Sequence, residues 1–132
     1  MKYIYSAVFS TNEDGTKYYA RIPDLPGCIT TGSNLHDAIE QITDAASGWL
    51  VVAEDEKIPI PTPTRQDSML HEPGCVFSLV QVDTIAYRAL TDTRAVRKNV
   101  SLPAWMVDLA DKRGINCSQV LQEGLTARFN AQ

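Results

Sequence analysis

Three polar side chains alternate along the segment Val96–Leu102 and carry hydrogen-bonding groups suited to nucleic-acid bases. In an extended strand, successive side chains point to opposite faces, so Arg97, Asn99 and Ser101 share one face. A guanidinium group suits guanine or a phosphate, and a carboxamide suits adenine. The remaining side chains of the segment are largely apolar. The spacing therefore predicts a strand with one face for bases or phosphates and one face for protein.

Two short helices are expected to follow this strand. Pro103 suits the first position of a helix, which Lys112, Arg113 and Gly114 then close. Asn116 has the side chain of an N-cap, and Gln119 follows three residues later, so a second helix is expected to begin here. Its apolar stripe comprises Cys117, Val120, Leu121, Gly124, Leu125 and Phe129. The open backbone amides near Cys117 and Ser118 would form a phosphate anchor.

A single copy of this region buries too little apolar surface to be stable alone, and a lone strand leaves its backbone amides and carbonyls unpaired. We therefore expect a homodimer or a higher homo-oligomer. Two antiparallel strands would present the polar triplet twice on one ribbon, whose width fits the DNA major groove. The expected dimerisation residues are the apolar ones of the strand and the second helix, namely Val96, Val100, Leu102, Leu121, Gly124 and Leu125.

The order of strand, helix and helix resembles the ribbon-helix-helix repressors. That resemblance implies that Arg97, Asn99 and Ser101 contact base edges. An alternative is that these amphipathic helices are only core. The charge distribution favours DNA: residues 94–132 carry six basic and three acidic side chains, a net of +3, whereas the preceding residues carry six basic and thirteen acidic ones, a net of −7. Phosphate neutralisation supplies most nucleic-acid affinity.

The chain of 132 residues has a net charge of −4 and three cysteines without a C-x-x-C motif. No apolar run reaches the roughly 20 residues of a membrane span. The first residues lack the pattern of a signal peptide, so we expect free thiols and a cytoplasmic protein without membrane contact. Cys28 and Cys117 are expected to be small core residues.

The first part of the chain predicts an α+β domain of three strands, a helix and a strand. The expected elements are strands at Lys2–Ser10, Lys17–Ile22, Cys28–Thr31 and Val76–Val82, a helix from Leu35 to about Glu54, and a short helix at Ile85–Leu90. The first strand is apolar on both faces, which favours a central position. The domain boundaries are expected at 1–90 and 91–132.

The run Tyr19–Gly32 contains Asp24-Leu25-Pro26-Gly27-Cys28 and is followed by a helix for which Asn34 is the expected N-cap, and then by the proline-rich segment Ile58–Thr64. This combination resembles the HicB antitoxins. The resemblance implies a degenerate ribonuclease-H-like domain joined to a ribbon-helix-helix, and no enzymatic activity. It also implies a HicA-type toxin that cleaves mRNA and operator DNA as partners, with repression of the shared operon.

Two other functions are alternatives to this one. A metal-dependent ribonuclease would need several converging carboxylates, one of them on the first strand, which has none. Asp24 and Asp37 remain, but one lies in a loop and the other at a helix start. His36 and His71 are expected to be solvated, so no metal, cofactor or catalytic residue is expected. The other alternative is a transcriptional repressor whose first domain senses a small ligand.

Overall fold

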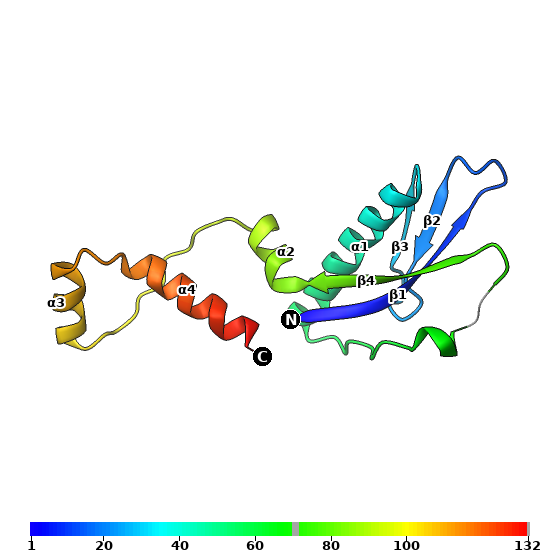
Figure 1. Cartoon of the computed structure of the whole chain (residues 1–132). Coiled ribbons are helices and arrows are strands. Elements are labelled where there is room, and N and C mark those ends of the chain that lie inside the picture. The colour runs from blue at the N-terminus through cyan, green and yellow to red at the C-terminus, as the bar shows by residue number, and fades with distance from the viewer. Residues whose placement is uncertain (70–71, 132) are drawn as a thin grey trace. The chain divides into compact units, whose positions relative to one another are not determined.

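The computed structural model describes residues 1–69 and 72–131. Two compact units are present, one formed by Lys2–Arg88 and one that contains Ala89–Gln132. The elements follow in chain order (Figure 1): β1 Lys2–Thr11, β2 Tyr18–Arg21, β3 Ile29–Gly32, α1 Leu35–Glu56, the short 3-10 helix η1 Gln66–Ser68, β4 Val76–Asp83, α2 Thr84–Thr91, α3 Ala104–Lys112 and α4 Cys117–Asn130.

The four strands form one antiparallel sheet in the order β3-β2-β1-β4. In this sheet Phe9 lies opposite Ala20, and Tyr5 lies opposite Val80. β1 occupies an interior position, as its apolar residues on both faces predict. Both faces of its middle part are also covered, since Tyr5 to Phe9 are buried without interruption.

Helix α1 is delimited by its own side chains and by the chain that follows. The Asn34 side chain accepts a hydrogen bond from the Asp37 backbone N–H at 2.8 Å, and the Asp37 carboxylate accepts one from the Ser33 N–H at 2.9 Å. At the other end, Lys57 adopts a left-handed conformation with φ 57° and donates its N–H to the Ala53 carbonyl. Pro59 follows two residues later and cannot continue the helix.

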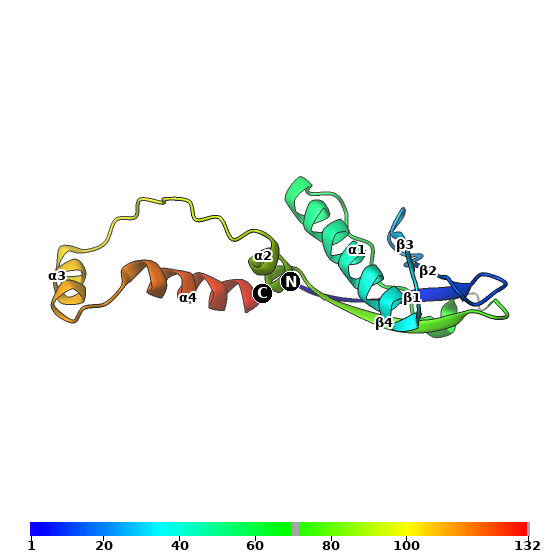
Figure 2. The ribbon, with the colours of Figure 1, turned by 90° about the horizontal axis from the view of Figure 1, so that it is seen from above.

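Helix α1 covers one face of the sheet (Figure 2), and the core lies between them. Its inward stripe repeats at helical spacing, which is why a single helix can cover four strands. The core comprises Tyr5, Ala7, Phe9, Ala20, Ile22, Leu25, Cys28, Ala38, Ile42, Ala46, Leu50, Val80 and Val82. At Gly32 the strand comes so close to α1 that an added Cβ would lie 2.5 Å from the Ala38 backbone nitrogen.

The proline-rich segment is fixed to the domain at two points. The Tyr5 hydroxyl donates a hydrogen bond to the Pro61 carbonyl. Both carboxylate oxygens of Asp24 accept hydrogen bonds from Thr64, one from its N–H at 2.8 Å and one from its hydroxyl at 2.6 Å. These contacts hold the segment after α1 although prolines exclude it from regular structure.

The observed elements confirm the predicted α+β class, with the strands and the long helix displaced by one or two residues at their ends. The short helix predicted at Ile85–Leu90 is α2, and the two helices predicted after Pro103 are α3 and α4. None of the helices formed by the described residues is long and apolar enough to cross a membrane.

Candidate nucleic-acid and dimerisation region

Residues 92–103 form no regular secondary structure in the single chain, so the strand predicted at Val96–Leu102 is not formed there. Every residue of this segment is exposed, and no backbone hydrogen bond ties residues 95–102 to another part of the described chain. A strand exists only through its hydrogen bonds to a second strand, and the single chain offers none here. The polar side chains of this segment, Arg97, Asn99 and Ser101, are therefore exposed. No hydrogen bonds to a second strand in the described chain fix their backbone.

The start of α4 follows the prediction closely. The Asn116 side chain accepts a hydrogen bond from the Gln119 N–H at 3.2 Å. The backbone amides of Cys117 and Ser118 have no acceptor among the described residues. Helix N-termini attract anions through such amides. The predicted phosphate anchor thus has its donors available.

Helices α3 and α4 bury none of their side chains. A hollow of about 380 Å³ lies between them and is lined, apart from Arg113, by apolar residues, including Val100, Leu102 and Leu121 of the predicted dimerisation set. Val96 and Leu125 of that set are also exposed. At Gly124 an added Cβ would meet no atom within 4 Å.

Several apolar residues of this surface were not among the predicted dimerisation residues. Trp105, Leu109 and Ile115 line the hollow and are exposed. The helical spacing of Trp105 and Leu109 was the available signal, whereas Ile115 lies in the short loop between the helices. The expectation that Cys117 is a buried core residue is wrong for the single chain, in which Cys117 at the start of α4 is exposed.

The basic side chains of this unit divide into paired and unpaired ones. Arg94 forms an ion pair with Asp92 at 2.9 Å, and Lys112 forms one with Asp108 at 2.9 Å. The Arg94 guanidinium lowers the pKa of Asp92. In the described part of the chain, no carboxylate pairs with the remaining cations, Arg97, Lys98, Arg113 and Arg128. These four are available for phosphates.

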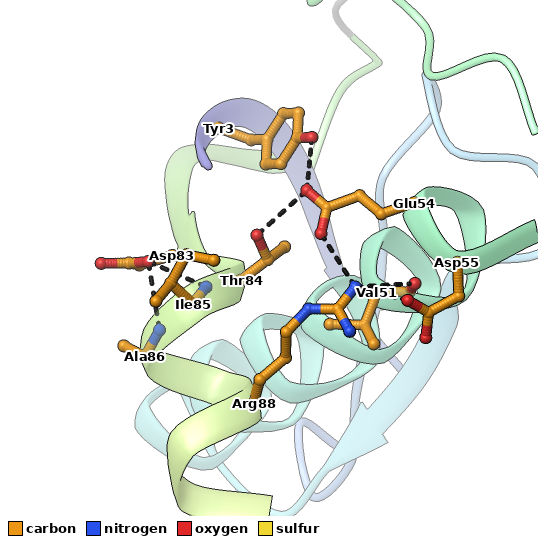
Figure 3. Close-up of polar contacts among 9 residues, drawn as sticks. All are labelled: Tyr3, Val51, Glu54, Asp55, Asp83, Thr84, Ile85, Ala86 and Arg88. Carbon is orange, nitrogen blue, oxygen red and sulfur yellow. Dashed lines mark hydrogen bonds and ion pairs between the residues drawn. The ribbon is translucent and has the colours of Figure 1, made fainter. Parts of the chain in front are cut away.

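A polar network closes the end of the sheet domain where β4 passes into α2 (Figure 3). One oxygen of the Glu54 carboxylate accepts hydrogen bonds from the Tyr3 hydroxyl at 2.8 Å and the Thr84 hydroxyl at 3.0 Å. Its other oxygen lies 3.1 Å from Arg88, which also reaches Asp55 at 2.8 Å. Glu54 thereby joins β1 and the β4–α2 junction to α1.

The protonation of this network follows from its contacts. Burial raises the pKa of the Glu54 carboxyl group, but the hydrogen bonds from Tyr3, Arg88 and Thr84 outweigh it, so the net pKa lies below its ordinary value. Burial, and then the hydrogen bond to Glu54, raise the pKa of Tyr3 to about 12. Glu54 is therefore ionised and Tyr3 is neutral near pH 7.

The carboxylates considered for a ribonuclease have structural partners. Asp24 bonds Thr64, and Asp37 bonds Ser33 and Gln41 at the start of α1. Among residues 1–69 and 72–131, no group of three or more His, Cys, Asp or Glu side chains could hold a metal ion. His36 pairs with Glu40 on the exposed face of α1, and His71 lies outside the described residues.

Comparisons with known proteins complete this description. The chain is 26% identical over 97 residues to an uncharacterised 14.9 kDa protein of Haemophilus phage HP1, with 72% of this chain and 71% of that protein covered. Its fold is similar to a chain of a toxin–antitoxin complex from Streptococcus pneumoniae (TM-score 0.62, 21% identity, 97% and 99% of the two chains covered). It is also similar to the Burkholderia pseudomallei antitoxin HicB (TM-score 0.52, 23% identity, 96% of each chain covered).

The match that decides the family extends over both units of the chain. The model of the HicB-like antitoxins of bacterial toxin–antitoxin systems matches residues 5–126, which include most of α4 and the whole sheet except the first three residues of β1. The chain therefore belongs to the HicB-like antitoxin family.

Proposed function

We propose that this antitoxin binds a HicA-type toxin through Lys2–Arg88 and represses its own operon as a homodimer through the rest of the chain. Family membership supports the toxin partner, and so does the likeness to a chain of a toxin–antitoxin complex. The finer assignment of the first domain as a degenerate ribonuclease-H-like fold is part of this proposal. Three antiparallel strands followed by a helix and a fourth strand support it.

The observation that carries the DNA-binding half is the absence of any buried side chain in α3 and α4. A folded unit with this much exposed apolar surface needs a partner. A second copy supplies one, because the exposed segment 96–102 can pair with itself and the hollow can receive the same residues of the other chain. Such pairing gives the ribbon-helix-helix arrangement.

The paired ribbon would then carry two sets of Arg97, Asn99 and Ser101, flanked by the open amides of α4. We propose that the three side chains contact bases and that the amides of Cys117 and Ser118 hold a phosphate. The four cations that have no carboxylate partner among the described residues, Arg97, Lys98, Arg113 and Arg128, would add the non-specific attraction to the duplex. The residues before 94 carry a net negative charge, so residues 94–132 are the part of the chain with a net positive charge.

A gel-shift assay with DNA from upstream of the operon tests the proposal. The double variant Arg97→Ala and Asn99→Ala is expected to lower operator affinity by roughly 100-fold, because it removes a bidentate group and a phosphate or base contact from each strand of the ribbon. Arg128→Ala with Asn130→Ala is the matched control, since it removes the same two residue types at the same spacing from the exposed end of α4. Equal affinity of the two variants would remove Arg97 and Asn99 from the DNA interface.

The toxin half is tested by co-expression with a HicA-type toxin. A truncated chain without residues 94–132 is expected to co-purify with that protein, because the sheet domain has its own core. Circular dichroism of the truncated chain verifies that it is folded. A folded truncated chain that no longer binds would show that the toxin contacts the C-terminal unit.

A further inference from the structure

A second hollow, of about 480 Å³, lies on the sheet domain beside the second half of α1. Its walls come from four parts of the chain: Ile29 at the start of β3, Trp49 and Val52 of α1, Ile58 after α1, and Tyr87 of α2. It is separate from the hollow between α3 and α4. The DNA-binding half of the proposed function makes no use of it.

The walls are apolar and face solvent. Ile29, Val52 and Ile58 expose 65%, 50% and 44% of their surfaces. The Trp49 indole is held in place because its Nε1–H donates a hydrogen bond to the Pro26 carbonyl at 3.0 Å. Gly48 leaves the floor open, since a Cβ there would meet only the Tyr87 hydroxyl at 3.8 Å. Fixed, exposed apolar walls are typical of a surface that a partner covers.

One charged residue, Asp44, lies among the residues that line this hollow. Its carboxylate has no hydrogen bond or ion pair with any residue in the described ranges, whereas Asp37, Glu40, Glu54 and Asp55 of the same helix all have partners. Helix α1 carries six acidic residues and no lysine or arginine. The potential at the rim of the hollow is therefore negative.

An apolar trough with one carboxylate at its rim matches a long basic side chain. The aliphatic stem of lysine or arginine buries against apolar walls while the charged end reaches a carboxylate. The rings of Trp49 and Tyr87 add cation–π attraction. A purely apolar side chain would instead leave the Asp44 carboxylate partly desolvated and unpaired, which is unfavourable.

We propose that this hollow receives a lysine or arginine side chain of the toxin. This inference rests on the proposed function, since a protein that cleaves RNA presents basic side chains to phosphates. Covering such a side chain would both anchor the toxin and remove a cation from its RNA-binding surface. Asp44 is then the residue that gives the contact its charge specificity.

Two substitutions in the full-length antitoxin test the hollow, one through its charge and one through its volume. The quantity measured is binding to the toxin from the same operon. Asp44→Asn removes the carboxylate, and Gly48→Met fills the floor with a residue of good helix propensity. Each is expected to weaken toxin binding about tenfold or more, mainly through faster dissociation. The matched controls are Asp14→Asn in the β1–β2 turn and Gly48→Ala, which are expected to stay within about twofold of the wild type. Surface plasmon resonance measures the rates.

A probe that does not depend on the toxin separates this inference from the proposed function. Trilysine titrated into the full-length, nitrogen-15-labelled chain is expected to shift the amide resonances of Gly48 and Val52, and to shift them less in Asp44→Asn. If Asp44→Asn and Gly48→Met both bind the toxin as tightly as the wild type does, the hollow does not contact the toxin. The proposed antitoxin function would not be affected by that result. Absence of toxin binding by the wild type, with the trilysine shifts intact, would overturn the toxin partner but retain a site for basic side chains. Trilysine shifts that are absent in the wild type would overturn the site.

Discussion

Both units of this chain contain helices with an apolar stripe, but only the sheet domain buries that stripe. Helix α1 carries an apolar stripe at helical spacing, and the sheet covers it so that Ala38, Ile42, Ala46 and Leu50 are fully buried. Helices α3 and α4 carry the same kind of stripe, but none of their side chains is buried. The periodicity identifies which face must be covered. It does not identify the molecule that covers it.

The same contrast applies to the strands. The residues of β1 find partners within the chain on both sides, in β2 and β4. The segment 96–102 has the alternation of a strand and no partner within the described chain. The sheet domain therefore satisfies the backbone hydrogen bonds of its strands within one chain. We propose that segment 96–102 satisfies its own by pairing with a second copy of the chain. Each unit contains one of the two tryptophans, Trp49 and Trp105, so fluorescence can follow them separately.

The largest effect is expected where the sheet domain is most tightly closed. Gly32→Ala places a methyl group against the Ala38 backbone, which cannot move without displacing α1, so we expect a loss of about 3 kcal/mol in the unfolding free energy. Urea denaturation followed by Trp49 in a Trp105→Phe background measures it. The Trp105 signal, followed in a Trp49→Phe background, is expected to stay unchanged. Equal losses in both signals would mean that the units do not unfold independently.

The exposed neighbour Thr31→Ala is the control for Gly32→Ala. It alters the same edge strand without approaching α1 and is expected to change the unfolding free energy by less than about 0.5 kcal/mol. A large loss in this control would show that the strand itself, rather than its contact with α1, sets the stability.

A smaller, pH-dependent effect is expected at the Glu54 network. Glu54→Gln removes the charged acceptor of Tyr3, Thr84 and Arg88, so we expect a loss of about 2 kcal/mol at pH 7. The pKa of the folded carboxyl group lies below its ordinary value of 4.5, so its contribution is complete above that value. The contribution is lost as the pH falls through the lowered pKa. The difference between wild type and variant should therefore narrow in acid.

Asp55→Asn tests whether burial rather than charge produces this effect. Asp55 pairs with the same Arg88 guanidinium, but 58% of its side chain is exposed. Its loss should cost less than about 1 kcal/mol, since solvent screens exposed ion pairs. Equal losses for Glu54→Gln and Asp55→Asn would assign the effect to Arg88 alone and not to the hydroxyl groups that share Glu54.

Sequence reasoning predicted what local residues determine. Asn34 and Asn116 were identified as helix caps and both accept the expected backbone hydrogen bond. The end of α1 was predicted near Glu54 and lies at Glu56, because the left-handed turn at Lys57 has no glycine to mark it. A helix N-cap can therefore be recognised from three or four consecutive residues of the sequence. A left-handed turn without glycine cannot be recognised in this way.

Features that depend on distant residues were not predicted. The partners of Glu54 lie 30 to 51 positions away in the chain, so no spacing rule connects them. The hollow beside Asp44 joins the β2–β3 loop, α1 and α2, and no single segment signals it. The segment 96–102 was predicted as a strand from its own alternation, but its ladder would require another molecule. Its predicted role in dimerisation and DNA binding stays a prediction.

The smallest effect concerns two helical glycines, one in each unit, and gives the sharpest test of the contrast. Replacing a helical glycine by alanine stabilises a helix by about 1 kcal/mol if the methyl group meets no obstacle. Neither Gly48 nor Gly124 has a close obstacle in the single chain. Gly48→Ala is therefore expected to raise the stability followed by Trp49 by about 1 kcal/mol. Gly124→Ala is expected to lower the stability followed by Trp105 by a similar amount, because in the proposed dimer the helices of two copies would approach closely at that position.

The sign of the Gly124→Ala effect distinguishes the two states of this unit. A monomeric unit must gain stability from the substitution, whereas a dimer with a close helix crossing must lose it. Protein concentration provides the control, since a tenfold increase adds about 1.4 kcal/mol to a dimer and nothing to a monomer. The Trp105 signal should therefore depend on concentration and the Trp49 signal should not. If Gly124→Ala stabilises the unit and its stability does not depend on protein concentration, then α3 and α4 fold without a second copy. The proposed pairing of segment 96–102 between two copies would then be wrong.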